Sequence, residues 1–137
     1  MKNIKLLLIL LSASILTFSS CTVEDEKDSC ENIAGVWKGG YVCPQGATDL
    51  SLVISQDECS LTAIFNFSES DNNPGVPSGS FQMEGSFSQL ETFDLQGVEW
   101  IDQPLGYEMV DILGSILNPR KDIRVSICGN NTVLTLQ

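Results

Sequence analysis

Apolar and polar residues alternate along most of the chain from residue 34 onward. The alternation is clearest at Leu50, Leu52 and Ile54, and again from Phe81 to Phe87. A repeat of two residues places successive side chains on opposite faces of a β-strand. Gly, Pro, Asn and Asp interrupt the pattern at short intervals, and no helical period is sustained. The pattern predicts strands over 34–42, 49–55, 60–67, 79–88, 92–100, 107–117, 122–128 and 132–137.

These strands follow one another as hairpins, which favours an all-β fold. We expect a single antiparallel up-and-down β-barrel of about eight strands over 34–137, because closure removes the sheet edges that invite aggregation. Large side chains occupy the inward positions, so the lumen is expected to be filled. These positions are Leu52, Ile54, Phe65, Phe81, Met83 and Phe93.

The first predicted strand carries the tripeptide Gly35-Val36-Trp37. It resembles the G-x-W opening of the calycins, the lipocalin and avidin type of barrel, and the resemblance implies that Trp37 plugs the barrel floor. A longer pattern over 37–48, 76–81 and 100–107 is similar to a module that recurs in secreted bacterial proteins and has no assigned activity.

The first twenty residues have the composition of a secretory signal peptide. Lys2 and Lys5 precede an apolar stretch that ends in the small residues Ser19 and Ser20. Cys21 follows directly, and this arrangement resembles the lipobox of bacterial lipoproteins. The resemblance implies cleavage after residue 20 and a lipidated Cys21, carrying fatty acyl groups such as palmitate.

Residues 21–33 are predicted to be a lipidated acidic tether. Like charges without apolar residues cannot collapse into a core, so residues 22–29 are expected to be solvated. A short acidic run behind a lipidated cysteine also resembles the surface-export signal of lipoproteins in the Bacteroidota. We therefore expect a lipid anchor in the bacterial outer membrane, with the acidic run favouring the cell surface over the periplasmic face.

Five cysteines are present, and assigning Cys21 to lipid leaves an even number in an oxidising compartment. In an up-and-down barrel the start of the first strand and the second turn share one end, and these places hold Cys30 and Cys59. Cys43 and Cys128 fall at the opposite end. The topology therefore predicts the disulfides Cys30–Cys59 and Cys43–Cys128.

Composition excludes several classes of function. The 137 residues include 7 Lys and Arg, 18 Asp and Glu and no His, with a net charge of −11 that becomes −13 once Lys2 and Lys5 are removed with the signal peptide. Such acidity disfavours nucleic-acid binding, and the missing histidine excludes Ser-His-Asp catalysis and His-ligated zinc. The run 71–73 offers oxygen ligands for Ca²⁺, but no second carboxylate cluster follows it. We expect no catalytic residue, metal or cofactor, and no enzymatic activity.

The loops at the end opposite the N-terminus are the expected binding region, since loops on a rigid scaffold carry most binding sites. Aromatic rings, amides and carboxylates there suit stacking on and hydrogen bonding to a sugar or peptide. The candidate ligand-binding residues are Trp100, Asp102, Gln103, Tyr107, Asn72 and Asn73. The alternative is that Trp100 caps the barrel core while 104–106 simply form the hairpin turn.

The function that fits best is a non-enzymatic binding module for a glycan or a protein, engaged through the membrane-distal loops. A second hypothesis is that the protein inhibits a protease or a lysozyme, a role in which small calycin-like barrels are known. A third is an accessory subunit of an envelope complex, signalled by an apolar patch along the barrel wall. An inhibitor would present a rigid protruding loop, whereas a glycan binder would show coplanar exposed aromatic rings.

Overall fold

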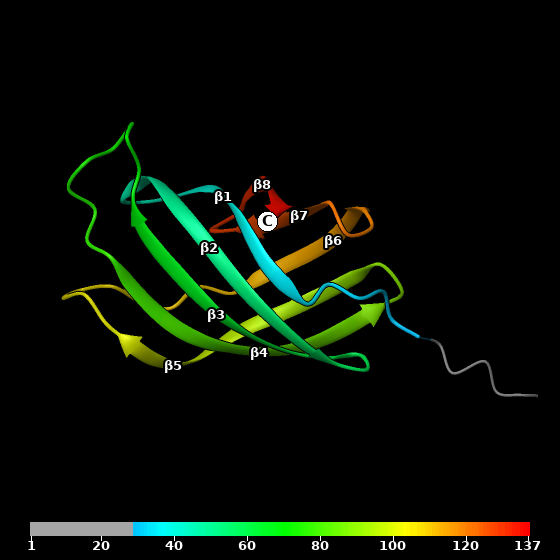
Figure 1. The fold of residues 1–137 in the computed structure, drawn as a ribbon. Coiled ribbons are helices and arrows are strands. Elements are labelled where there is room, and N and C mark those ends of the chain that lie inside the picture. The colour runs from blue at the N-terminus through cyan, green and yellow to red at the C-terminus, as the bar shows by residue number, and fades with distance from the viewer. Residues whose placement is uncertain (1–28) are drawn as a thin grey trace, which may run out of the picture.

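The computed structural model describes residues 29–137, which form a closed antiparallel β-barrel of eight strands (Figure 1). The strands are β1 (Gly35–Cys43), β2 (Gly46–Asp57), β3 (Ser60–Glu69), β4 (Gly79–Gln89), β5 (Thr92–Asp102), β6 (Ile112–Asn118), β7 (Asp122–Ile127) and β8 (Asn130–Leu136). Each strand pairs with its neighbours in chain order, and β8 closes on β1. The predicted up-and-down barrel is confirmed. The predicted signal peptide, Cys21 and residues 22–28 lie outside the described residues.

The predicted sixth strand over 107–117 is wrong in its first part. Strand β6 begins at Ile112, and residues 103–111 form an irregular connection, named here the β5–β6 loop. Strand β5 pairs with β6 only from Thr92 to Leu95. Farther along, a Cβ atom added to Gly97 would lie 2.7 Å from the Cβ atom of Met109. The residues near Met109 are therefore apolar because they cover β5, not because they belong to a paired strand.

The middle of the lumen is filled, as predicted. The six inward residues named above are each at most 3% exposed, and Trp37 is completely buried. Among the described residues, every buried side-chain nitrogen or oxygen atom has a hydrogen-bond partner. No helix in residues 29–137 is long and apolar enough to span a membrane.

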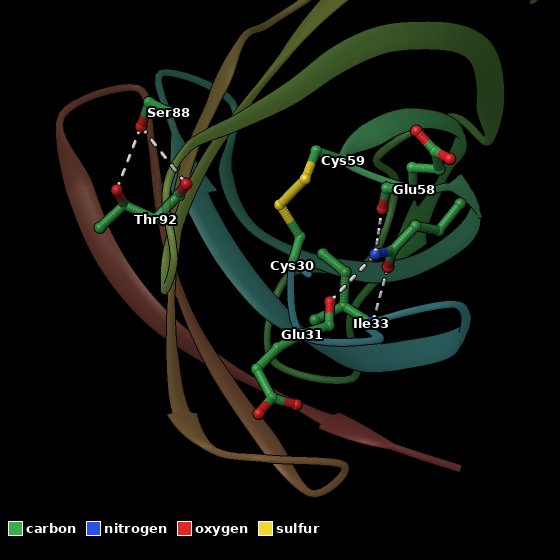
Figure 2. Close-up of a disulfide and its surroundings, with 8 residues drawn as sticks. Cys30, Glu31, Ile33, Glu58, Cys59, Ser88 and Thr92 are labelled. Atoms are coloured by element: carbon green, nitrogen blue, oxygen red, sulfur yellow. Dashed lines mark hydrogen bonds between the residues drawn. A yellow bond between two sulfur atoms is a disulfide. The ribbon is translucent and has the colours of Figure 1, made fainter. Parts of the chain in front are cut away.

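One end of the barrel is closed by residues 29–34, and we call it the closed end; it also carries the β2–β3, β4–β5 and β6–β7 turns (Figure 1). The Cys30–Cys59 disulfide ties this segment to the β2–β3 turn (Figure 2). The Trp37 indole N–H donates to the Ile33 carbonyl at 2.8 Å, and Ile33 is 1% exposed. Packed structure thus begins before residue 34, the predicted domain boundary.

The Gln56 side chain holds the same segment from β2. Its amide oxygen accepts from the Ile33 N–H at 2.8 Å, and its amide nitrogen donates to the carbonyls of Glu31 and Glu58 at 3.1 and 2.7 Å (Figure 2). Arg120, in the β6–β7 turn, donates to the Ala34 carbonyl at 3.1 Å. Several connections therefore fix the N-terminal segment across this end of the lumen.

The other end, which we call the open end, carries residues 43–46, 70–78, 103–111 and 128–129 (left in Figure 1). The Cys43–Cys128 disulfide joins the β1–β2 turn to the β7–β8 turn there. Both predicted disulfide pairings are confirmed. They were predictable because strand order alone decides which cysteines share an end of the barrel.

The seam between β1 and β8 depends partly on side chains. The paired residues are Trp37 with Leu136 and Lys38 with Thr135. Toward the open end, the Thr132 hydroxyl donates to the Gly40 carbonyl at 2.6 Å, and the Asn130 amide donates to the Val42 carbonyl at 2.9 Å. Side-chain donors thus extend the seam where the regular ladder stops.

Candidate functional site

A cavity of about 400 Å³ lies at the open end, between the β1–β2 turn and the β5–β6 loop. We call it the mouth cavity. Aromatic and sulfur-containing groups provide most of its wall, and Glu108 is its one charged lining side chain. The lining includes Tyr41, Phe65, Phe67, Phe81, Tyr107, Met109 and the Cys43–Cys128 disulfide. A concave, mainly apolar site with a few polar groups is the usual form of a small-ligand pocket.

Ring contacts hold the walls of this cavity in place. Phe65 stacks on Phe81 with ring centroids 4.7 Å apart, and Tyr41 meets Phe65 edge-on at 5.4 Å. Phe67 stacks on Tyr107 at 5.6 Å, with ring planes 12° apart. Each ring is thus positioned by a neighbour, so the cavity is preformed.

Trp100 packs against this cluster instead of standing free at the rim. Its ring lies edge-on to Phe81 at 5.1 Å and to Phe67 at 6.4 Å, with an interplanar angle of 72° to Phe67. Because Tyr107 is nearly parallel to Phe67, Trp100 and Tyr107 are not coplanar. The geometry agrees with the alternative in which Trp100 caps the core.

Tyr41 contributes a polar group that stays neutral. Burial raises the pKa of Tyr41 to about 12, and side-chain hydrogen bonds with Thr48 and Gln45 oppose part of that shift. Thr48 is 1% exposed; its hydroxyl donates to the Gly46 carbonyl at 3.1 Å and accepts from the Gln45 amide at 3.2 Å. The base of the β1–β2 turn is therefore fixed by a small polar network.

The predicted residues Asn72 and Asn73 have different surroundings. The Asn73 amide donates to the carbonyls of Gln45 and Ala47, at 2.8 and 3.1 Å, and so ties residues 70–78 to the β1–β2 turn. Asn72 is exposed and lines a separate hollow beside Thr132 on the outer wall. The structure therefore does not bring these two amides together with Trp100 or Tyr107 in one pocket.

The β5–β6 loop is a braced protrusion. The Tyr107 N–H donates to the Pro104 carbonyl at 3.2 Å across a turn in which Gly106 has a φ of 81°. Positive φ at that position is the signature of a type II turn. The predicted residue Gln103 donates from its side-chain amide to the Tyr107 carbonyl at 3.0 Å. Leu105, at the tip, is completely exposed.

Exposed apolar residues continue along the end of β5. Val98 and Ile101 are 46% and 53% exposed, and each is the extra residue at a break in the β4–β5 register. Bulges of this kind bend a strand and re-aim its side chains. Residues 96–111 contain four acids and no lysine or arginine. We call Val98, Ile101 and Leu105 with these acids the β5 surface.

The predicted residue Asp102 belongs to a polar groove on the outer wall. This groove of about 740 Å³ follows one register row across the sheet: Lys38, Ser51, Asn66, Ser80 and Asp102. These residues alternate with lumen residues, so they face outward. We call this feature the outer groove.

Sequence reasoning missed the main components of the open end. Tyr41 and Phe67 follow the inward alternation of their strands, which could have placed them at the rim. Met109 and Glu108 lie within the predicted strand 107–117, and Leu105 lies in the predicted rim loop but is not among the candidate ligand-binding residues. Among residues 29–137, no three cysteines or acids gather as metal ligands would.

The comparisons with known proteins add no family: no family model, curated protein or solved structure matches the chain.

Proposed function

We propose that this protein is a bacterial outer-membrane lipoprotein whose barrel is a non-enzymatic binding module for a protein ligand. The lipobox-like sequence before Cys21 and the acidic run after it support the anchor. The chain enters the barrel at the closed end, so an anchor at residue 21 leaves the open end facing away from the membrane. The proposed partner therefore meets the β5 surface and the loops around it.

The observation that carries the proposal is the full exposure of Leu105 on a braced turn. An ordered apolar side chain loses little conformational entropy on binding and gains by leaving water. Val98 and Ile101 extend the exposed apolar surface along β5, and the same stretch, residues 96–111, adds four acids and no lysine or arginine. An apolar centre with a charged rim is typical of a protein interface, and this rim fits a basic partner.

The test uses paired substitutions and capture from envelope extracts. Leu105→Asp with Ile101→Asp should remove the partners that the unchanged protein retains, because both carboxylates would enter the apolar contact. Leu90→Asp is the matched control, since Leu90 is 57% exposed in the β4–β5 turn at the closed end. The same partners retained by the folded double variant would refute the proposed surface.

The inhibitor hypothesis is a narrower form of the same proposal, and the protruding loop favours it. In that case Leu105 would occupy the specificity pocket of a protease or the cleft of a lysozyme. Residual enzyme activity measured against increasing protein concentration would show inhibition that Leu105→Asp abolishes. Unchanged activity across a panel of such enzymes would leave only the binding role.

Glycan binding is supported by a different region of the molecule, the outer groove. The outer groove offers hydroxyl, amide and carboxylate groups in one row, whereas Trp100 and Tyr107 do not form a stacking platform. Binding of envelope polysaccharides that is lost in Asn66→Ala with Asp102→Ala, and kept in Leu105→Asp, would assign the glycan to this groove.

The anchor has its own test. Cys21→Ser should remove the protein from the outer-membrane fraction and abolish labelling by radioactive palmitate. Palmitate labelling or outer-membrane association that persists in Cys21→Ser would contradict the lipid anchor.

A further inference from the structure

The mouth cavity has a chemistry that a protein interface at the β5 surface does not use. Its walls are the rings of Tyr41, Phe65, Phe67, Phe81 and Tyr107. An aromatic face carries negative electrostatic potential and attracts cations as well as apolar groups. A volume of about 400 Å³ lies within the usual range for small-ligand sites.

The charges around the cavity have one sign. Glu108 is the one charged side chain in its lining, and it is exposed at the mouth. Residues 29–137 contain four cationic side chains, and none lines the cavity. Lys38 lies in the outer groove, Arg120 and Lys121 lie in the β6–β7 turn at the closed end, and Arg124 is on β7. The mouth cavity therefore has a carboxylate at its rim and no lysine or arginine in its lining to offset that negative charge.

The single negative charge and the aromatic walls together favour one class of small ligand. An anion would meet Glu108 with no cation to offset the repulsion, and a strongly polar neutral molecule would lose its hydration against aromatic walls. A molecule with an apolar body and a positive group satisfies both features, because the body contacts the rings and the cation meets the carboxylate. Negative potential around a cleft also raises the local concentration of cations.

We propose that the mouth cavity binds a small organic cation. Its apolar part lies between the β1–β2 turn and Met109 against the aromatic walls, and its ammonium group lies at the rim beside Glu108. Apart from Glu108, which also belongs to the β5 surface, this site is built from residues that the β5 surface does not contain.

Three soluble probes of similar size test the charge preference: 2-phenylethylamine, 2-phenylethanol and 3-phenylpropionate. The purified full chain carrying Cys21→Ser is titrated with each probe, and dissociation constants are taken from NMR shifts of backbone amides and methionine methyl groups. The amine should bind about tenfold more tightly than the alcohol, and the propionate should bind most weakly. The shifts should centre on Tyr107, Met109 and the β1–β2 turn.

Matched variants then test the residue that carries the preference. Glu108→Gln should weaken binding of the amine about fivefold and leave the alcohol unchanged within about twofold. Glu91→Gln removes the same charge at the β4–β5 turn of the closed end and should change neither. Leu105→Ser, which removes the apolar side chain at the tip without adding a charge, should also leave amine binding intact, and this result would separate the amine site from the apolar part of the β5 surface.

Equal affinity for the three probes, absence of amine binding at millimolar concentration, or shifts confined to another face would each overturn the proposal. So would an amine affinity that Glu108→Gln leaves unchanged.

Discussion

Gly85 lies directly against the backbone of the neighbouring strand β5. A Cβ atom added there would overlap the Asp94 carbonyl oxygen, which is backbone and cannot rotate away. At Gly40, the nearest atom to an added Cβ is the Thr48 carbonyl oxygen at 3.5 Å, an ordinary contact. Two glycines on strands of the same barrel therefore differ in whether they tolerate a methyl group.

Gly85→Ala should lower the free energy of unfolding by about 2 kcal/mol or more, because β4 and β5 must separate to admit the methyl group. Gly40→Ala should change the same quantity by less than about 0.5 kcal/mol. Urea denaturation with the disulfides intact measures both. Similar costs at the two positions would contradict this assignment.

Tyr41 makes stability depend on alkaline pH. Its pKa is raised from 10.0 to about 12 in the folded protein by burial, so the unfolded chain releases the phenol proton first as the pH rises. The free energy of unfolding is unaffected below pH 10 and should fall above it, by about 1.4 kcal/mol at pH 11. Tyr41→Phe should remove this part of the decline. Parallel pH profiles for the two proteins would rule out Tyr41 as its source.

At the scale of elements, the β1–β8 seam depends on donors outside the regular ladder. Thr132→Val keeps the shape of the side chain but leaves the Gly40 carbonyl without its donor at 2.6 Å. The substitution should cost about 1 kcal/mol of unfolding free energy and speed hydrogen exchange in β8. Thr62→Val, at an exposed position on β3, is the control for the change of residue type. Equal exchange rates in β8 for the two variants would show that the hydroxyl is not needed.

Strand positions were largely predictable because alternation in this chain reflects a lumen on one side and water on the other. The prediction failed between 107 and 111, where apolar residues are required by a cavity and by contact with Gly97. Alternation cannot distinguish these causes. The sequence predicts which loops lie at the open end, but it does not predict how their residues are arranged. Trp100 packs inward against Phe81, and Asn73 donates hydrogen bonds to the β1–β2 turn. Both arrangements depend on tertiary contacts.

For the whole molecule, the two disulfides enclose very different lengths of chain. Cys43–Cys128 has a sequence separation of 85 and Cys30–Cys59 one of 29. Chain entropy then predicts losses of about 4.6 and about 3.6 kcal/mol when each is removed. The double variant Cys43→Ala with Cys128→Ala should unfold at lower urea concentration than the double variant Cys30→Ala with Cys59→Ala. The opposite order would show that fixing residues 29–34 across the closed end outweighs chain entropy.

The longer of these covalent rings also determines what a protease can do to the molecule. Residues 70–78 and the β5–β6 loop both lie between Cys43 and Cys128, so a single cut in either leaves two fragments that remain covalently linked. The nicked chain keeps every strand and its neighbours, and it runs as one band until a reductant separates it into two. The loops that reach furthest from the barrel are therefore the ones whose backbone can be cut without releasing half of the protein.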